Sequence, residues 1–307
     1  MRTVFLGLMG AAWLLAEIHH NAGSTEPLPH EKYIHVVSES DSPVQQTYIK
    51  SKDGLYIAAA IRKPKGGGRY PAIIIFHGAP GGRGMDQLAG WSRGDWGGPV
   101  WERFLQEGYV VAVADYRGGN MNLMSAPAAN GMITSIDDGL AVIDYIKNLP
   151  YVDPQQINLY GVSLGGNLVM NLVSRVPVHA AIVGAPAVMW FLGIHMPPPG
   201  APPNPDALKD LKPDPEVSRA NIAPITSPIL ILVGTADRLM PTAVMLHDAL
   251  AAAGKTVRLD IYEGGYHDFC LGPQGQKRPD LPHGEALYDS ALDALEKSVA
   301  FLAGKLK

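Results

Sequence analysis

The stretch Gly161-Val162-Ser163-Leu164-Gly165 constrains the fold of this chain more than any other. It reads G-x-S-x-G and directly follows residues 156–160, a short apolar run typical of a buried strand, while residues 164–174 lack proline and are typical of a helix. Flanking glycines let a backbone turn sharply between strand and helix and lift the serine hydroxyl clear of the sheet. A glycine-rich turn with an inert serine is the alternative, and the downstream sequence decides for Ser163 as a nucleophile.

A serine hydroxyl is a poor nucleophile at neutral pH, so it needs a base that takes its proton and a carboxylate that orients the base. Asp237 follows the strand-like residues 228–233, and His267 follows the strand-like residues 256–262. The carboxyl ends of parallel strands meet at the edge of an open α/β sheet where ligands bind. The sequence therefore predicts a triad of Ser163, Asp237 and His267.

Other carboxylates and histidines compete for these two roles. Asp268 adjoins His267, but neighbours in sequence rarely orient each other's side chains, and Asp260 alternates along a strand and is expected to face solvent. His247 falls in a helical pattern, and His283 lies in a proline-rich loop without a strand end to hold it. His267 is the better base by position.

The negative charge that develops on a substrate oxygen needs fixed N–H donors. The backbone N–H of Leu164, directly after the serine, is one candidate. The second lies in the loop that begins at His77, after the apolar residues 72–75, and because Pro80 has no N–H we predict Ala79 as the donor. His77 could itself be catalytic, but we expect it to pack at the strand end and hold this loop.

Several motifs together resemble the α/β-hydrolase superfamily, and within it the catalytic domains of prolyl-oligopeptidase and dienelactone-hydrolase-like proteins. The motifs are His77-Gly78-x-Pro80-Gly81-Gly82, Asp115-Tyr116-Arg117-Gly118-Gly119, Tyr151-Val152-Asp153-Pro154, Ser163 with Gly165-Gly166, Gly234-Thr235-Ala236-Asp237-Arg238 and Tyr266-His267-Asp268-Phe269. The resemblance implies an α/β-hydrolase fold and a metal-free serine hydrolase that acts through an acyl-enzyme. In two respects the chain departs from these groups, because dienelactone hydrolases proper carry a cysteine at the position of Ser163 and full prolyl oligopeptidases carry a β-propeller.

Length and composition fit one large α/β domain. The chain has 307 residues, of which 47% are hydrophobic, and its net charge of −4 offers no basic surface for nucleic acid. Residues 45–49 and 55–61 are expected to form an antiparallel hairpin that opens a mostly parallel, doubly wound sheet. No His, Cys or carboxylate cluster shows metal-ligand spacing, so we expect neither a metal nor another cofactor.

The first residues are typical of a signal peptide. A short positive region precedes the apolar residues 4–16, which are too few to span a bilayer comfortably. We predict that residues 1–22 direct export to the periplasm or the medium, with an uncertain cleavage site and an uncleaved membrane anchor as the alternative. Residues 23–44 are expected to be a linker to the catalytic domain, residues 45–307. The single Cys270 excludes an internal disulfide.

Two insertions begin after strands, at the edge of the sheet that carries the predicted triad. Residues 81–99 are glycine-rich, and residues 190–227 are proline-rich and expected to form a small cap. Both are candidates for the wall of a substrate pocket. The candidate pocket residues are aromatic: Trp91, Trp96, Tyr116 and Trp190. Each tryptophan could equally pack on the domain.

Three functions remain open from the sequence. The first is hydrolysis of a small carboxylic ester, with Ser163 as nucleophile, His267 as base and Asp237 orienting the imidazole. The second is a serine peptidase acting on short peptides, which the resemblance implies, although no acidic pair for gripping a peptide amino terminus is recognisable. The third is an inactive binding protein on the same fold. The physiological substrate and the oligomeric state cannot be read from the sequence.

Overall fold

The structure is a computed structural model that describes residues 17–21, 42–93, 96–117, 126–194, 211–271, 284–304 and 306. Several predictions lie outside these residues. They concern residues 1–16 of the signal peptide, nearly all of the linker, residues 195–210 of the cap and His283.

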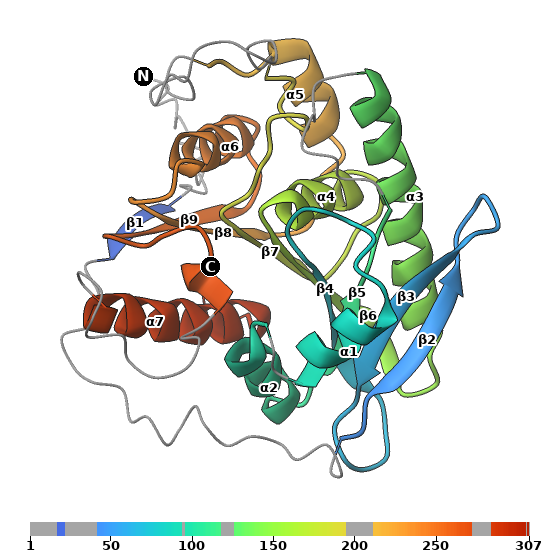
Figure 1. The fold of residues 1–307 in the computed structure, drawn as a ribbon. Helices are drawn as coiled ribbons and strands as arrows, with labels where there is room; N and C mark the ends of the chain where they lie inside the picture. Colours follow the sequence, from blue (N-terminus) through green and yellow to red (C-terminus); the bar gives the residue numbers. More distant parts are fainter. Residues whose placement is uncertain are drawn as a thin grey trace, which may run out of the picture.

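One sheet runs through the described part of the molecule, in the strand order β1-β9-β8-β7-β6-β4-β5-β3-β2 (Figure 1). Its strands are β1 (Glu17–Asn21), β2 (Gln45–Lys50), β3 (Tyr56–Arg62), β4 (Tyr70–Phe76), β5 (Val110–Ala114), β6 (Val152–Val162), β7 (Ala180–Gly184), β8 (Ile229–Gly234) and β9 (Val257–Tyr262). β3 is antiparallel to both β2 and β5, and the remaining pairs are parallel. This confirms the predicted mostly parallel sheet with an antiparallel hairpin at its start.

Helices cover both faces of the sheet (Figure 1). The helices are α1 (Met85–Arg93), α2 (Gly98–Gln106), α3 (Ala126–Lys147), α4 (Leu164–Val173), α5 (Pro215–Ile222), α6 (Met240–Ala252), α7 (Gly284–Leu302) and the short 3₁₀ helix η2 (Phe269–Leu271). Residues of α3, α4, α5 and α6 join the core on one face, and residues of α1, α2 and α7 join the core on the other. The sheet is therefore doubly wound, as predicted.

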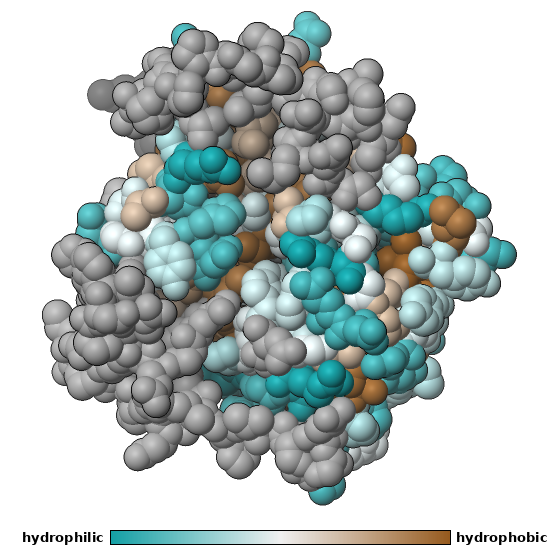
Figure 2. Space-filling model, viewed as in Figure 1, coloured by the Kyte–Doolittle hydropathy of each residue, from teal (hydrophilic) through white to brown (hydrophobic). Residues whose placement is uncertain are grey.

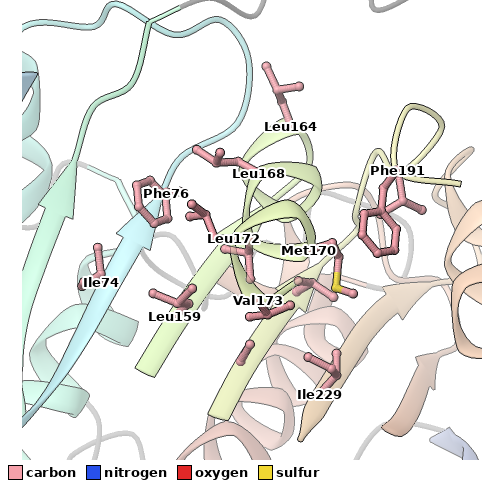
Figure 3. Packing of buried hydrophobic residues seen from close by; sticks show 14 of the residues in the cluster. Ile74, Phe76, Leu159, Leu164, Leu168, Met170, Leu172, Val173, Phe191 and Ile229 are labelled. Carbon is pink, nitrogen blue, oxygen red and sulfur yellow. The ribbon is translucent and has the colours of Figure 1, made fainter. Parts of the chain in front are cut away.

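The central strand β4 shows how these two cores arise. Ile74 and Phe76 point into the core beneath α4, while Ile73 and Ile75 point into the core on the opposite face. Side chains alternate along a strand, so a strand covered on both faces is apolar throughout. Figure 3 shows Leu168 of α4 packed beside the sheet residue Phe76. Complete burial of one such side chain contributes about 1.5–3 kcal/mol, which fixes α4 against β4 and β6.

The structure differs from the predicted elements in three places. Helix α1 occupies residues 85–93 of the glycine-rich insertion 81–99, in which no helix was predicted. Strand β7 was not predicted. Residues 17–21, inside the predicted signal peptide, form the edge strand β1 beside β9. Cleavage after residue 22 would remove β1 from the sheet.

The described surface in the view of Figure 2 is largely hydrophilic or neutral, with an apolar area over the β2–β3 hairpin. Leu55 in that hairpin is 57% exposed. Among the residues that the structure describes, no helix is both long and apolar enough to cross a membrane.

Candidate active site

Ser163 occupies a strained turn between β6 and α4. Its backbone has φ 55° and ψ −115°, a conformation that L-residues rarely adopt. The Ser163 N–H donates to the carbonyl of Gly184 over 2.9 Å, and the Ser163 carbonyl accepts from the N–H of Ala187 over 2.9 Å. Strain of this kind costs about 1–3 kcal/mol and persists only where the surroundings hold it. The local geometry is that of the predicted nucleophile turn.

The flanking glycines are required by close backbone contacts at this turn. A Cβ atom at Gly161 would clash with the carbonyl group of Gly165. A Cβ atom at Gly165 would clash with the carbonyl group of Phe76 and would lie 2.5 Å from the carbonyl oxygen of His77. Helix α4 therefore starts in direct contact with the end of β4, which brings Ser163 next to the loop that follows β4.

His267 and Asp237 form a hydrogen-bonded pair. Nδ1 of His267 lies 2.9 Å from Oδ2 of Asp237, and the other carboxylate oxygen accepts the N–H of Leu239 over 2.9 Å. The Asp237 side chain is 1% exposed, whereas that of His267 is 41% exposed. The hydrogen bond to Asp237 raises the pKa of His267 above its usual value, although partial burial opposes the shift. Because Nδ1 is engaged, Nε2 is the nitrogen that can accept a proton.

The loops that carry this pair are joined by backbone contacts at the ends of β8 and β9. The N–H of Ala236 donates to the carbonyl of Gly265 over 3.0 Å, and the N–H of Gly264 donates to Oγ1 of Thr235 over 2.8 Å. A Cβ atom at Gly234 would clash with the carbonyl group of Gly265. Asp237 and His267 therefore lie on one compact unit at the same edge of the sheet as Ser163.

The competing residues lie elsewhere or make other contacts. Asp268 is exposed and acts on His267 only through a weaker electrostatic attraction. The expectation that Asp260 faces solvent is wrong, because its carboxylate is buried and bonded to Arg258 on the same strand at 2.8 and 3.0 Å. His247 is buried in α6, where its Nδ1 meets Oδ1 of Asp248 at 2.9 Å.

The loop after β4 lies against Ser163. A Cβ atom at Gly78 would lie 3.4 Å from Cβ and 4.0 Å from Oγ of Ser163. Within the described residues, no acceptor is recorded for the backbone N–H of Ala79 or for that of Leu164, the first residue of α4. Gly78, the residue before Ala79, thus lies against Ser163, and Leu164 follows the serine directly.

Asp115, at the end of β5, organises this loop, and the sequence analysis gave it no role. Its carboxylate accepts the N–H groups of Gly82 and Gly84, both over 2.9 Å, and that of Tyr116 over 2.8 Å. Nε2 of the buried His77 lies 3.2 Å from Oδ1 of Asp115. Although burial opposes ionisation, the hydrogen bonds from His77 and Gly84 hold the pKa of Asp115 at about 2. The only signal in the sequence was its place in the Asp115-Tyr116-Arg117 motif.

Tyr116 lies beneath the loop and does not line a pocket, contrary to the prediction. Its side chain is 1% exposed, and its hydroxyl donates to the carbonyl of His77 over 2.8 Å. Its ring stacks on the imidazole of His77, with ring centroids 4.7 Å apart. Trp91 meets the imidazole of His77 in an edge-to-face arrangement, with ring centroids 5.2 Å apart, and its ring centroid lies 4.8 Å from that of Trp96. Both tryptophans pack on the core beside α1 and α2. Trp190 is partly buried against the core on the face of α4.

The segment expected to form a cap is attached above α4. Oδ1 of Asn167, one turn after Ser163, accepts the N–H of Phe191 over 3.3 Å. Asn221 and Ser218 of α5 donate to the carbonyls of Phe191 and Leu192, over 2.8 and 3.0 Å. The described parts of this segment, before residue 195 and after residue 210, therefore hold to each other as well as to α4.

Cys270 is not an alternative nucleophile. Its thiol is buried against Gly184, and burial raises its pKa to about 12, so it stays protonated at neutral pH. Across the described ranges, no group of three or more His, Cys, Asp or Glu side chains could hold a metal ion.

The sheet order, the strained serine turn after β6 and the hydrogen-bonded His267–Asp237 pair after β8 and β9 are those of the α/β-hydrolase class. The model of the dienelactone hydrolase family matches residues 57–303. The chain belongs to this family of hydrolases.

The relatives and structural neighbours extend this result. An uncharacterised protein of Mycobacterium tuberculosis is 25% identical over 246 residues, which cover 79% of this chain and 75% of that protein. An esterase from Pyrobaculum calidifontis has a TM-score of 0.58 at 18% identity and matches over 89% of this chain and 90% of its own. An acylaminoacyl peptidase from Pyrococcus horikoshii has a TM-score of 0.59 at 16% identity and matches over 87% of this chain and 42% of its own. Identities this low show the shared fold.

Proposed function

We propose that the protein is a serine hydrolase that cleaves carboxylic esters through an acyl-enzyme. The observation that carries the proposal is the 2.9 Å contact between His267 and Asp237, at the sheet edge where Ser163 occupies its strained turn. A serine at such a turn with a histidine–carboxylate pair nearby is the arrangement that acyl transfer requires.

The reaction proceeds in two halves. Oγ of Ser163 attacks the ester carbonyl while Nε2 of His267 takes the hydroxyl proton, and the N–H groups of Ala79 and Leu164 donate to the developing oxyanion. The tetrahedral intermediate collapses, the bond to the alcohol breaks, and His267 returns its proton to the leaving oxygen. Water then loses a proton to His267 and attacks the acyl carbonyl; the bond between the acyl group and Oγ breaks, His267 returns the proton to Oγ of Ser163, and the acid leaves.

The same residues could cleave an amide, and the similarity to an acylaminoacyl peptidase keeps a serine peptidase acting on short peptides as the second candidate. Steady-state rates on p-nitrophenyl esters of increasing chain length, measured beside aminoacyl and prolyl anilides, separate the two. A higher kcat/KM on the anilides would favour the peptidase. An inactive binding protein would turn over neither and would resist a fluorophosphonate.

Replacement of the nucleophile tests the proposal directly. Ser163→Ala should lower ester hydrolysis by several orders of magnitude and abolish covalent labelling by a fluorophosphonate, while the protein stays folded. Ser174→Ala, at the other end of α4, is the matched control and should keep both properties. If Ser163→Ala keeps more than about a tenth of the wild-type rate, Ser163 is not the nucleophile.

We also propose export, on the basis of the positive region and the apolar residues 4–16. Cleavage after residue 16 would keep β1 in the sheet, whereas cleavage after residue 22 would remove it. N-terminal sequencing of protein recovered from the periplasm or medium locates the cut. Recovery in the membrane fraction with an intact N-terminus supports the uncleaved anchor, and recovery only from the cytoplasm contradicts export.

A further inference from the structure

His77 is buried between two acceptors. Its Nδ1 lies 2.7 Å from the carbonyl oxygen of Gly78, and its Nε2 lies 3.2 Å from Oδ1 of Asp115. The ring therefore bridges the backbone of the loop after β4 and the carboxylate that follows β5.

The contact with Gly78 has a directional consequence. The Gly78 carbonyl and the Ala79 N–H belong to one peptide unit, which is trans, so the two bonds lie in one plane and point in opposite directions. Holding the carbonyl oxygen on His77 therefore turns the Ala79 N–H away from His77. The Cβ position of Gly78, in the same stretch of backbone, faces Ser163 at 3.4 Å.

Hydrogen bonds from Arg83 hold the backbone that directly follows this peptide unit and so oppose its rotation. Nη2 of Arg83 donates to the carbonyl of Ala79 over 2.8 Å, and Nε of Arg83 donates to the carbonyl of Pro80 over 3.0 Å. The imidazole stacks on the ring of Tyr116 and meets the ring of Trp91 in an edge-to-face arrangement. The groups that face His77 are thus one carboxylate, one carbonyl and two aromatic rings.

We propose that His77, held at its Nε2 by Asp115, is a positioning residue that aims the Ala79 N–H at the substrate oxygen. This inference rests on the proposed function, because it assigns the Ala79 N–H to the oxyanion. His77 itself does not contact the reacting atoms. It acts through the Gly78–Ala79 peptide unit, and Asp115 acts through His77.

Two substitutions separate the two contacts of His77. The side-chain amide of His77→Asn can place its nitrogen where Nδ1 lies and keep the hydrogen bond to Gly78, whereas the longer amide of His77→Gln can reach Asp115 but loses Gly78. His77→Gln should lower kcat by about 10- to 100-fold with KM changed by no more than about twofold, because oxyanion donors act mainly in the transition state. His77→Asn should keep most of kcat. His179→Gln, before β7 at the opposite end of the sheet, is the matched control.

Equal losses in the two His77 variants, or a rise in KM without a fall in kcat, would overturn the inference. Urea unfolding of both variants checks that a loss of kcat is not a loss of fold. A fluorophosphonate titration is run in parallel. If the wild-type protein is not labelled, the proposed function fails; if labelling is complete and the two variants are alike, only the role of His77 fails.

Discussion

Gly165→Ala tests whether contact between α4 and the end of β4 positions the site. The added Cβ atom would lie 2.5 Å from the carbonyl oxygen of His77, whereas ordinary contacts begin at 3.4 Å, so α4 and β4 must separate by about 1 Å. Overpacking of this kind costs typically about 1–3 kcal/mol. Two backbone carbonyls cannot move aside as a side chain can, so we expect the upper end. Alanine is more favourable than glycine in a helix by about 1 kcal/mol, so the net loss in the free energy of unfolding is about 2 kcal/mol.

Gly98→Ala is the control for this substitution, because Gly98 also begins a helix and a Cβ there meets nothing within 4 Å. Urea unfolding followed by tryptophan fluorescence should show a lower midpoint for Gly165→Ala and an unchanged or higher one for Gly98→Ala. A displacement of about 1 Å beside the nucleophile should also lower kcat by about 10²-fold. Equal stability and equal kcat in the two variants would refute the reasoning.

Three further predictions concern the chemistry of the site. Asp237→Asn should lower kcat by about 10²–10⁴-fold, because the imidazole loses the carboxylate that orients it, while Asp268→Asn should change little; the reverse ranking in steady-state assays would assign the acid to Asp268. His267 must be neutral to accept a proton and its pKa is raised, so kcat/KM should rise with pH through a midpoint above 6.5 that falls in Asp237→Asn, whereas a flat profile from about pH 5 to 8 would argue against a histidine base. Dialysis against EDTA should leave the rate unchanged, because every proposed step uses side chains and backbone N–H groups; loss of activity that zinc or calcium restores would contradict this mechanism.

The parts of the fold that follow from local sequence were predictable. Apolar runs bounded by glycine or proline marked β4, β6, β8 and β9, and the residues predicted as the triad follow three of these strands at one edge of the sheet. Helix α1 was missed because its sequence, Met85–Arg93, lies between glycine-rich stretches and presents few apolar residues, of which Leu88 is fully buried. Strand β7 is short and rich in small residues, so burial rather than periodicity makes it a strand.

The organisation of the oxyanion loop could not be predicted from local patterns. Asp115 meets His77 because β5 pairs with β4 in the register that places Ala114 opposite Phe76. That register is a property of the assembled sheet, and nothing in the sequence near either residue encodes it. For the same reason Tyr116 was expected to face a pocket, whereas its hydroxyl is committed to a backbone carbonyl beneath the loop.

The attachment of the segment between β7 and β8 has a consequence for how such a chain can diversify. The serine turn and the loop after β4 lie in contact and form one unit, and the hydrogen-bonded pair after β8 and β9 forms another. The segment from Trp190 to Pro228 connects the first unit to the second and is fastened to α4 through Asn167. Its length and composition can therefore change without altering the bonds within either unit. The segment that can select the substrate is thus separate in sequence from the residues that cleave the bond. New specificities can arise by exchange of this segment while the reacting groups stay in place.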